Sequence, residues 1–167
     1  MSHTEHRAES PSTTHCFVLT VSDTRTPETD RGGDTIVELL KADGHVVAGR
    51  TIVPDEPDRV RETLRAAIDA PDVDVAITTG GTGITQRDGT YEVVTGLLDK
   101  RLDGFGELFR ALSYEEIGPA AMLSRATGGL AGRTIVLSLP GSPNAVRLAM
   151  TKLILPELGH LVREARR

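Results

Sequence analysis

The sequence predicts a single α/β domain: a three-layer α/β/α sandwich with a mostly parallel mixed sheet and one antiparallel strand. Two observations predict it. Short, continuous apolar runs are typical of strands that are buried on both faces, as in parallel sheets. Apolar residues at helical spacing lie between these runs, and strands that alternate with helices form a sheet with helices on both sides. The length of 167 residues allows one well-buried core.

Apolar runs predict the parallel strands in chain order. The first run ends in polar residues, and the third leads directly into a glycine-rich loop. The expected strands are residues 16–22, 45–53, 73–79 and 134–139. Helices are expected between them, because apolar residues recur at helical spacing. These stripes are Ile36, Val37, Leu39 and Leu40, then Val60, Leu64, Ala67 and Ile68, then Tyr91, Val94, Leu97 and Leu98. Gly44 and Pro71 are expected to end the first two helices.

The rest of the chain supplies the antiparallel strand. Residues 102–126 are expected to be mostly helical, with a break near Gly118. Two extended pieces on either side of Gly132 predict a hairpin, which introduces one antiparallel strand into the sheet. Pro143 suits the first turn of a closing helix, where its missing amide proton does no harm.

Composition excludes several classes of protein. The net charge of −5 and the 3% aromatic content argue against nucleic-acid and membrane surfaces. Cys16 is the only cysteine, so no intrachain disulfide or thiolate metal site is possible. Residues 1–14 are polar without an apolar core, which predicts a disordered tail and not a signal peptide. We therefore expect a cytoplasmic protein whose single domain spans residues 15–167.

Polar clusters follow several of the predicted strands. Ligands of open α/β sheets bind beyond the carboxyl ends of the strands, so clusters at those ends form one candidate site. Hydroxyl, amide and carboxylate groups there can orient a polar ligand. The clusters are Ser22-Asp23, Pro54-Asp55-Glu56, the loop from Thr79 to Gly83, and Leu139 to Ser142 with Asn144.

The loop Thr79-Gly80-Gly81-Thr82-Gly83 is the most distinctive of these clusters. Without a Cβ, glycines let successive amides point at one anion. The known nucleotide signatures fail, however. No lysine follows as in a Walker loop, and Gln86 stands where a Rossmann loop has its third glycine. A tight structural turn therefore remains an open alternative to a binding loop.

Two aspartates are candidate metal ligands. Asp88 follows the glycine loop, where a carboxylate repels phosphate unless a divalent cation lies between them. Asp55 offers a second carboxylate for metal or acid–base chemistry across from Asp88. Each has an ordinary alternative: Asp88 as a helix cap, and Asp55 in a solvated loop. Arg87 can pair with a phosphate or form a surface salt bridge.

Taken together, these motifs resemble the MoaB/MogA family of molybdenum cofactor biosynthesis proteins. The resemblance covers roughly residues 15 to 162, and residues 123–126 are closer to MoaB than to MogA. The matching motifs, in the family's order, are Pro54-Asp55-Glu56, Thr78-Thr79-Gly80-Gly81-Thr82-Gly83, Arg87-Asp88 and Leu139-Pro140-Gly141-Ser142-Pro143.

The resemblance implies a reaction: Mg²⁺-dependent transfer of AMP from ATP to the terminal phosphate of molybdopterin, with release of pyrophosphate. It places the family's two important aspartates at Asp55 and Asp88. It places the nucleotide and pterin loop at residues 80–83 and a second binding loop at residues 140–143. It also implies a homo-oligomer, a hexamer for the MoaB type and a trimer for the MogA type.

Alternatives and one departure accompany this interpretation. A non-catalytic molybdopterin-binding oligomer of MoaB type stays open, as does an NAD-dependent oxidoreductase on a Rossmann sheet. The family commonly has a proline where this chain has Tyr91, and Gly89 is expected to loosen the turn that holds Asp88. Thr90 is expected to cap the helix that begins near Tyr91.

Overall fold

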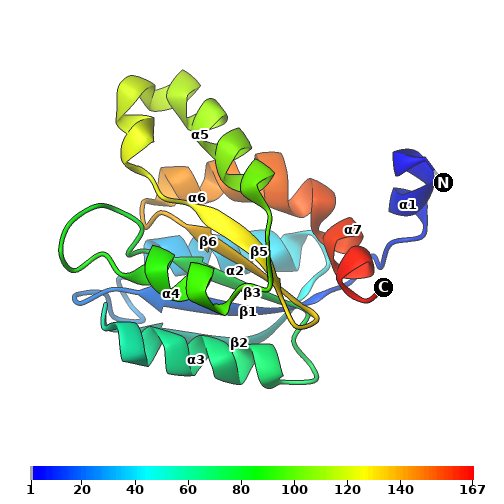
Figure 1. Cartoon of the computed structure of the whole chain (residues 1–167), viewed down its shortest axis with the longest axis horizontal. Helices are drawn as coiled ribbons and strands as arrows, with labels where there is room; N and C mark the ends of the chain where they lie inside the picture. Colours follow the sequence, from blue (N-terminus) through cyan, green and yellow to red (C-terminus); the bar gives the residue numbers. More distant parts are fainter. Residues whose placement is uncertain (1) are drawn as a thin grey trace.

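The computed structural model describes residues 2–167, apart from the side chain of His6, and confirms the predicted three-layer sandwich (Figure 1). The middle layer is a six-stranded sheet in the order β2-β1-β3-β6-β5-β4. The strands are β1 (His15–Val21), β2 (Val46–Val53), β3 (Val75–Thr79), β4 (Lys100–Arg101), β5 (Thr127–Ala131) and β6 (Thr134–Leu139).

The sheet has the predicted mixed direction. β1 runs parallel to β2 and β3, and β3 runs parallel to β6. β5 runs antiparallel to both of its neighbours, β4 and β6, so the single reversed strand is confirmed. The hairpin turns at Gly132, whose φ is +61°. The two-residue strand β4 was not predicted, because two exposed charged residues carry no strand pattern.

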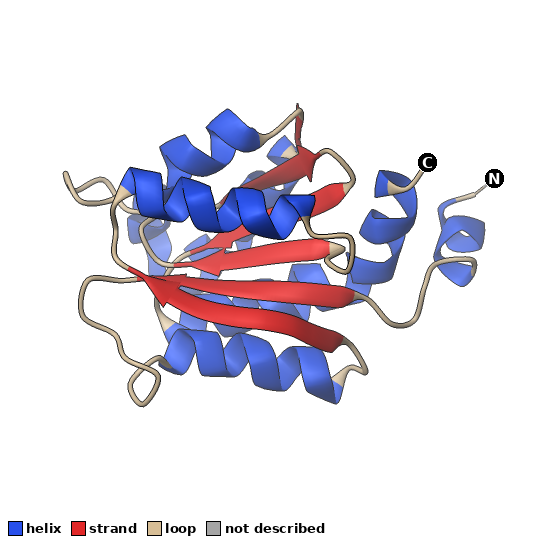
Figure 2. Ribbon diagram, turned by 90° about the horizontal axis from the view of Figure 1, so that it is seen from below, coloured by secondary structure: helices blue, strands red, loops and turns tan. Residues whose placement is uncertain are grey.

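Helices cover both faces of the sheet (Figure 2). One face carries α2 (Arg31–Ala42), α5 (Asp103–Ile117), α6 (Pro143–Ala149) and α7 (Leu155–Ala165), and the other carries α3 (Pro57–Asp69) and α4 (Thr90–Leu97). The short segments η1 (Gly118–Leu123) and η2 (Met150–Ile154) follow α5 and α6. In the described part of the chain, no helix combines the length and apolarity that a membrane crossing requires.

Each face of the sheet has its own apolar core. On one face, Ile36 and Leu40 of α2 pack in the same cluster as Phe109 of α5. On the other face, Val60 and Leu64 of α3 share a cluster with the start of α4. All these side chains are fully buried, and each contributes about 1.5–3 kcal/mol by leaving water. Packing on both sides holds the strand ends, and the loops that follow them, in fixed positions.

The amino-terminal segment differs from the disordered tail that we expected. It contains the short helix α1 (His3–Ala8), which begins with a capping box between Ser2 and Glu5. Arg7 and Glu9 pair with Glu157 and Arg163 of α7. The sequence hides this helix because its ion-pair partners lie about 150 residues away in the chain. Met1 lies outside the described residues.

Candidate functional site

The strand order creates a crevice at the carboxyl ends of β1 and β3. Helix α2 follows β1 on one face of the sheet, and α3 follows β2 on the opposite face. Open α/β sheets bind ligands at such a switch point between neighbouring strands. A cavity of about 430 Å³ lies there, lined by the ends of β1 and β3, the start of α2 and the β6–α6 loop.

This cavity, called the switch-point cavity below, brings together predicted residues from three separate loops. They are Ser22, Thr79, Gly80, Gly141 and Ser142. Thr79 Oγ1 donates to the Pro140 carbonyl at 2.8 Å, which ties the loop after β3 to the loop after β6. Ser142 Oγ accepts from the Ala145 amide at 3.2 Å and caps α6. Asn144 is exposed on the first turn of α6 and does not line this cavity.

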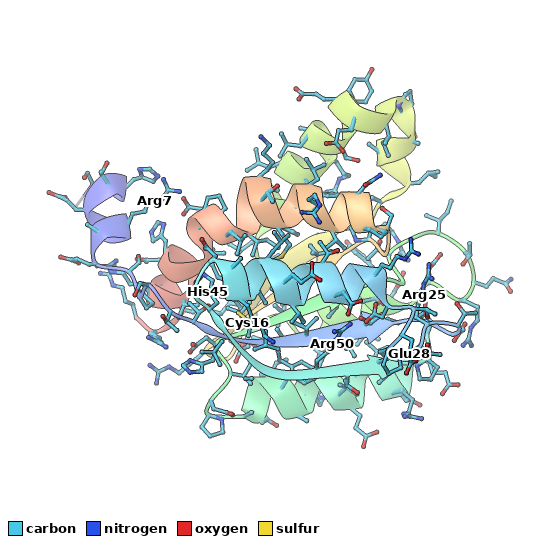
Figure 3. All side chains as sticks on the ribbon, turned by 180° about the vertical axis from the view of Figure 1, so that it is seen from behind. Arg7, Cys16, Arg25, Glu28, His45 and Arg50 are labelled. Atoms are coloured by element: carbon cyan, nitrogen blue, oxygen red, sulfur yellow. The ribbon has the colours of Figure 1, made fainter. Side chains whose placement is uncertain are left out.

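The switch-point cavity is also lined by two arginines that no sequence motif had marked. Arg31 stands at the start of α2, and Arg25 lies in the preceding loop. Arg25 also borders a neighbouring hollow of about 680 Å³, which Asp23 lines as well. Figure 3 shows Arg25 at the end of the sheet where β2 terminates. No sequence signal marked these arginines, because a polar loop gives no sign that it folds back over a strand end.

The glycine loop is a tight turn, and its glycines are required. Gly80 has φ +98° and Gly81 has φ +71°, a region that other residues rarely adopt. A Cβ on Gly80 would lie 2.2 Å from the Val21 carbonyl oxygen. The Gly80 amide donates to the Leu139 carbonyl at 3.0 Å, so it is not available to an anion. In the part of the chain described, no acceptor bonds the amides of Gly81, Thr82 or Gly83.

Asp55 is buried, so the alternative that it lies in a solvated loop is wrong. Its amide donates to Asp23 Oδ1 at 3.0 Å, and its own Oδ1 accepts from the Gly89 amide at 3.3 Å. Burial raises the pKa of the Asp55 carboxyl; the Gly89 bond opposes the rise, and the negative charges of Asp88 and Asp23 add to it. The surroundings of Asp55 therefore disfavour the ionised form of its carboxyl.

Asp88 faces a different hollow. Its Oδ2 accepts from the Thr85 amide at 2.9 Å and from Thr85 Oγ1 at 2.7 Å, which closes the turn before it. It lines a hollow of about 430 Å³ with Gln86 and Arg125, and Asp55 does not border that hollow. Among the described side chains, no three His, Cys, Asp or Glu residues are gathered closely enough to hold a metal ion. The two aspartates are neighbours, but they do not share a cavity.

Thr90 differs from the expected helix cap. It is the first residue of α4, Gly89 holds the cap position, and no side chain caps the helix. Among the described side chains, Thr90 Oγ1 is the one buried oxygen or nitrogen without a hydrogen-bond partner. A Cβ on Gly81 would lie 2.2 Å from Thr90 Oγ1 and 2.9 Å from Asp55 Oδ2. Thr90 Oγ1 and Asp55 Oδ2 therefore lie beside the same glycine.

Arg87 forms a surface ion pair, one of the two roles that the sequence allows for it. Its guanidinium binds Asp23 at 2.7 Å, and both side chains are exposed. The pair joins the loop after β1 to the loop before α4. Gly89, by contrast, is not required by the backbone, because its φ of −118° suits any residue.

Comparison with known proteins places this fold and these loops in one family. Residues 17–160 match the family model described as "Probable molybdopterin binding domain". The chain belongs to this molybdopterin-binding family. It is 55% identical over 168 residues to molybdenum cofactor biosynthesis protein B of Bacillus cereus, covering 100% of this chain and 99% of the relative.

Solved structures agree with this membership. A crystal structure of a molybdenum cofactor biosynthesis protein B superposes with a TM-score of 0.92 at 54% identity, covering 95% of this chain and 99% of the other. The tungsten cofactor synthesizing protein MoaB of Pyrococcus furiosus has a TM-score of 0.85 at 42% identity, covering 95% and 100%. The resemblance to the MoaB/MogA family is thus confirmed, on the MoaB side. The order β2-β1-β3 also differs from the 3-2-1-4-5-6 order of a dinucleotide-binding Rossmann sheet.

Proposed function

We propose that this protein acts in molybdenum cofactor biosynthesis, transferring AMP from ATP to the terminal phosphate of molybdopterin with release of pyrophosphate. The switch-point cavity of about 430 Å³, in a chain of the molybdopterin-binding family, is the observation that carries the proposal. Its lining of hydroxyls, glycine backbone and the arginines Arg25 and Arg31 suits a polar, anionic ligand.

The reaction needs positioning and charge stabilisation more than a covalent nucleophile. A terminal phosphate oxygen of molybdopterin attacks the α-phosphorus of ATP, and the bond to the bridging oxygen breaks, so that pyrophosphate leaves with the electron pair. Arg25 and Arg31 supply positive charge to the phosphates in this proposal. The free amides of residues 81–83 offer further donors at the edge of the site.

The oxygens near Gly81 are of the kind that Mg²⁺ takes as ligands. Asp55 Oδ2 and the unpartnered Thr90 Oγ1 lie beside this glycine, and the Asp88 carboxylate follows in the adjoining loop. Asp55 and Asp88 would hold the ion, with Thr90 as a neutral third donor. When bound, Mg²⁺ supplies charge neutralisation at the phosphates. Burial raises the pKa of the Asp55 carboxyl, and a cation beside it would favour its ionised form, which supports this placement.

The experiment that tests this proposal uses the intact protein with molybdopterin, ATP and Mg²⁺, and measures adenylylated molybdopterin and pyrophosphate together. We expect equal amounts of both products from the wild type. We expect Asp88→Asn to lose Mg²⁺-dependent turnover while remaining folded. Asp69→Asn, an exposed carboxylate at the far end of α3, is the matched control and should retain activity. Full turnover by Asp88→Asn would eliminate its metal role.

One observation favours a second function, a molybdopterin-binding oligomer without catalysis. Asp88 is turned toward Thr85 and does not share a cavity with Asp55, so the proposed cation ligands are not yet gathered. In that case molybdopterin binds the wild type without any pyrophosphate release. The same incubation therefore separates the two functions.

We also propose that the protein assembles with copies of itself through α5 and η1. This arm stands out from the sandwich in Figure 1 and carries large apolar side chains that are exposed. Such patches on a monomer surface mark interaction sites. We define the α5–η1 apolar face as Leu108, Tyr114, Ile117, Met122 and Leu123.

A further inference from the structure

We propose that Arg125 is the positioning residue of Asp88: its guanidinium holds the ends of the loop that presents this carboxylate. Arg125 lies in the segment between η1 and β5, 37 residues after Asp88. The inference rests on the proposed function only in taking Asp88 as a cation ligand.

Arg125 bonds both ends of the loop 83–88. Nε donates to the Gly83 carbonyl at 2.9 Å, and Nη2 donates to the Asp88 carbonyl at 3.1 Å. The Arg125 amide also donates to the Thr82 carbonyl at 3.0 Å. The rigid fork of one guanidinium thus sets how far apart the two loop ends stand.

Helix α4 holds the guanidinium in turn. Glu92 accepts from both Nη1 and Nη2 of Arg125, and the Tyr91 ring centroid lies 5.0 Å from the Arg125 Cζ. Arg125 lowers the pKa of the Glu92 carboxyl by hydrogen bonding. Because Glu92 already neutralises its charge, Arg125 is better suited to orient the loop than to bind a phosphate itself.

The geometry links this clamp to the Asp88 carboxylate. A Cβ on Gly83 would lie 2.6 Å from Asp88 Oδ2, so the carboxylate rests against the residue that Arg125 grips. Asp88 and Arg125 line the same hollow of about 430 Å³. A shift of the loop ends therefore moves the carboxylate, although Arg125 touches neither of its oxygens.

The experiment compares Arg125→Lys with the wild type by Mn²⁺ binding, measured by electron spin resonance on the intact protein. Lysine keeps the charge but lacks the rigid planar fork whose separate nitrogens reach the two carbonyls. We expect Mn²⁺ affinity to fall about tenfold or more, the size typical when a group that orients a metal ligand is lost. Hydrogen exchange should quicken at residues 83–89 but not in α2. In turnover, the KM for Mg²⁺ should rise with little change in kcat.

Arg163→Lys is the matched control, because the Arg163 guanidinium is also held by ion pairs, here with Glu9 and Glu164 on the far side of the molecule. It should bind Mn²⁺ like the wild type. The double variant Arg125→Lys/Asp88→Asn should bind Mn²⁺ no worse than Asp88→Asn alone. Glu92→Gln keeps the carbonyl bonds and loses only the charged anchor, so its affinity should fall less than that of Arg125→Lys.

Several outcomes would overturn the inference. Wild-type Mn²⁺ affinity in Arg125→Lys is one, and additive losses in the double variant are another. The inference also fails if Mn²⁺ affinity falls in Arg125→Lys and Glu92→Gln only in proportion to the loss of folded protein. It fails as well if the wild type binds no Mn²⁺. A wild type that binds Mn²⁺ but makes no adenylylated product contradicts the proposed function. In that case, Mn²⁺ binding and hydrogen exchange alone decide whether Arg125 positions Asp88.

Discussion

The guanidinium of Arg87 grips both carboxylate oxygens of Asp23, with Nε 3.0 Å from Oδ2 and Nη2 2.7 Å from Oδ1. Asp23 also accepts the Asp55 amide, so it joins three loops at the carboxyl edge of the sheet. While this pair is intact, Nε and Nη2 of Arg87 are occupied by Asp23. A ligand that binds Arg87 through these two nitrogens has to displace Asp23 first.

Arg87→Gln should raise the pKa of Asp23 toward the ordinary aspartate range. The Arg87 hydrogen bonds are the main cause that lowers the Asp23 pKa, and the Asp55 amide adds a smaller effect. A depressed carboxyl pKa means that the pair stabilises the fold above the unfolded pKa, and that this stability disappears as pH falls through the folded pKa. Carboxyl NMR titration measures the shift. An unchanged Asp23 titration would show that the pair is not formed in solution.

Asp55→Asn should make the protein more stable at neutral pH. The folded pKa of Asp55 is raised, chiefly by burial, so the ionised carboxylate disfavours the folded state above that pKa. The gain should shrink as pH falls through the raised folded pKa toward about 4, where aspartate protonates even when unfolded. Urea unfolding at several pH values measures it. Asp58→Asn, exposed on α3, controls for the loss of one negative charge, and an equal gain there would refute burial as the cause.

Thr90→Val should stabilise the fold and weaken cation binding. Valine has nearly the same shape, and the buried hydroxyl has no partner, so its removal should gain about 1 kcal/mol. Thr95→Val is the control in the same helix, since Thr95 Oγ1 donates to the Tyr91 carbonyl at 2.8 Å and should yield no gain. Thermal unfolding measures the gain in stability, and Mn²⁺ titration measures the loss of cation affinity. If Thr90→Val is no more stable than Thr95→Val, the Thr90 hydroxyl has a hydrogen-bond partner in solution.

A charge on the α5–η1 apolar face should break the assembly. Met122→Glu and Ile117→Glu place a carboxylate where an apolar contact would be desolvated, which costs several kcal/mol in a buried interface. Sedimentation velocity should show a smaller particle than the wild type. Val46→Glu, on an exposed apolar residue of edge strand β2, should leave the particle size unchanged. A monomeric wild type would reject the proposed interface.

The sequence by itself determined the architecture and which polar clusters lie at the carboxyl ends of the strands. Strands such as residues 73–79 can be recognised in the sequence because a strand that is buried on both faces is a continuous apolar run. The hairpin at Gly132 and the start of α6 at Pro143 follow from backbone rules that act locally. The polar clusters could be placed at strand ends because each one directly follows an apolar run. The switch-point cavity brings several of them together.

Only the tertiary structure decided what each polar side chain does there. It assigned Arg87 to Asp23 and Asp88 to Thr85, placed Arg25 at the cavity, and left Thr90 Oγ1 without a partner. The short helix α1 likewise depends on partners in α7. The physical reason is common to all of them. A hydrogen bond or ion pair depends on atoms within about 3 Å, and its partners can come from any distance along the chain.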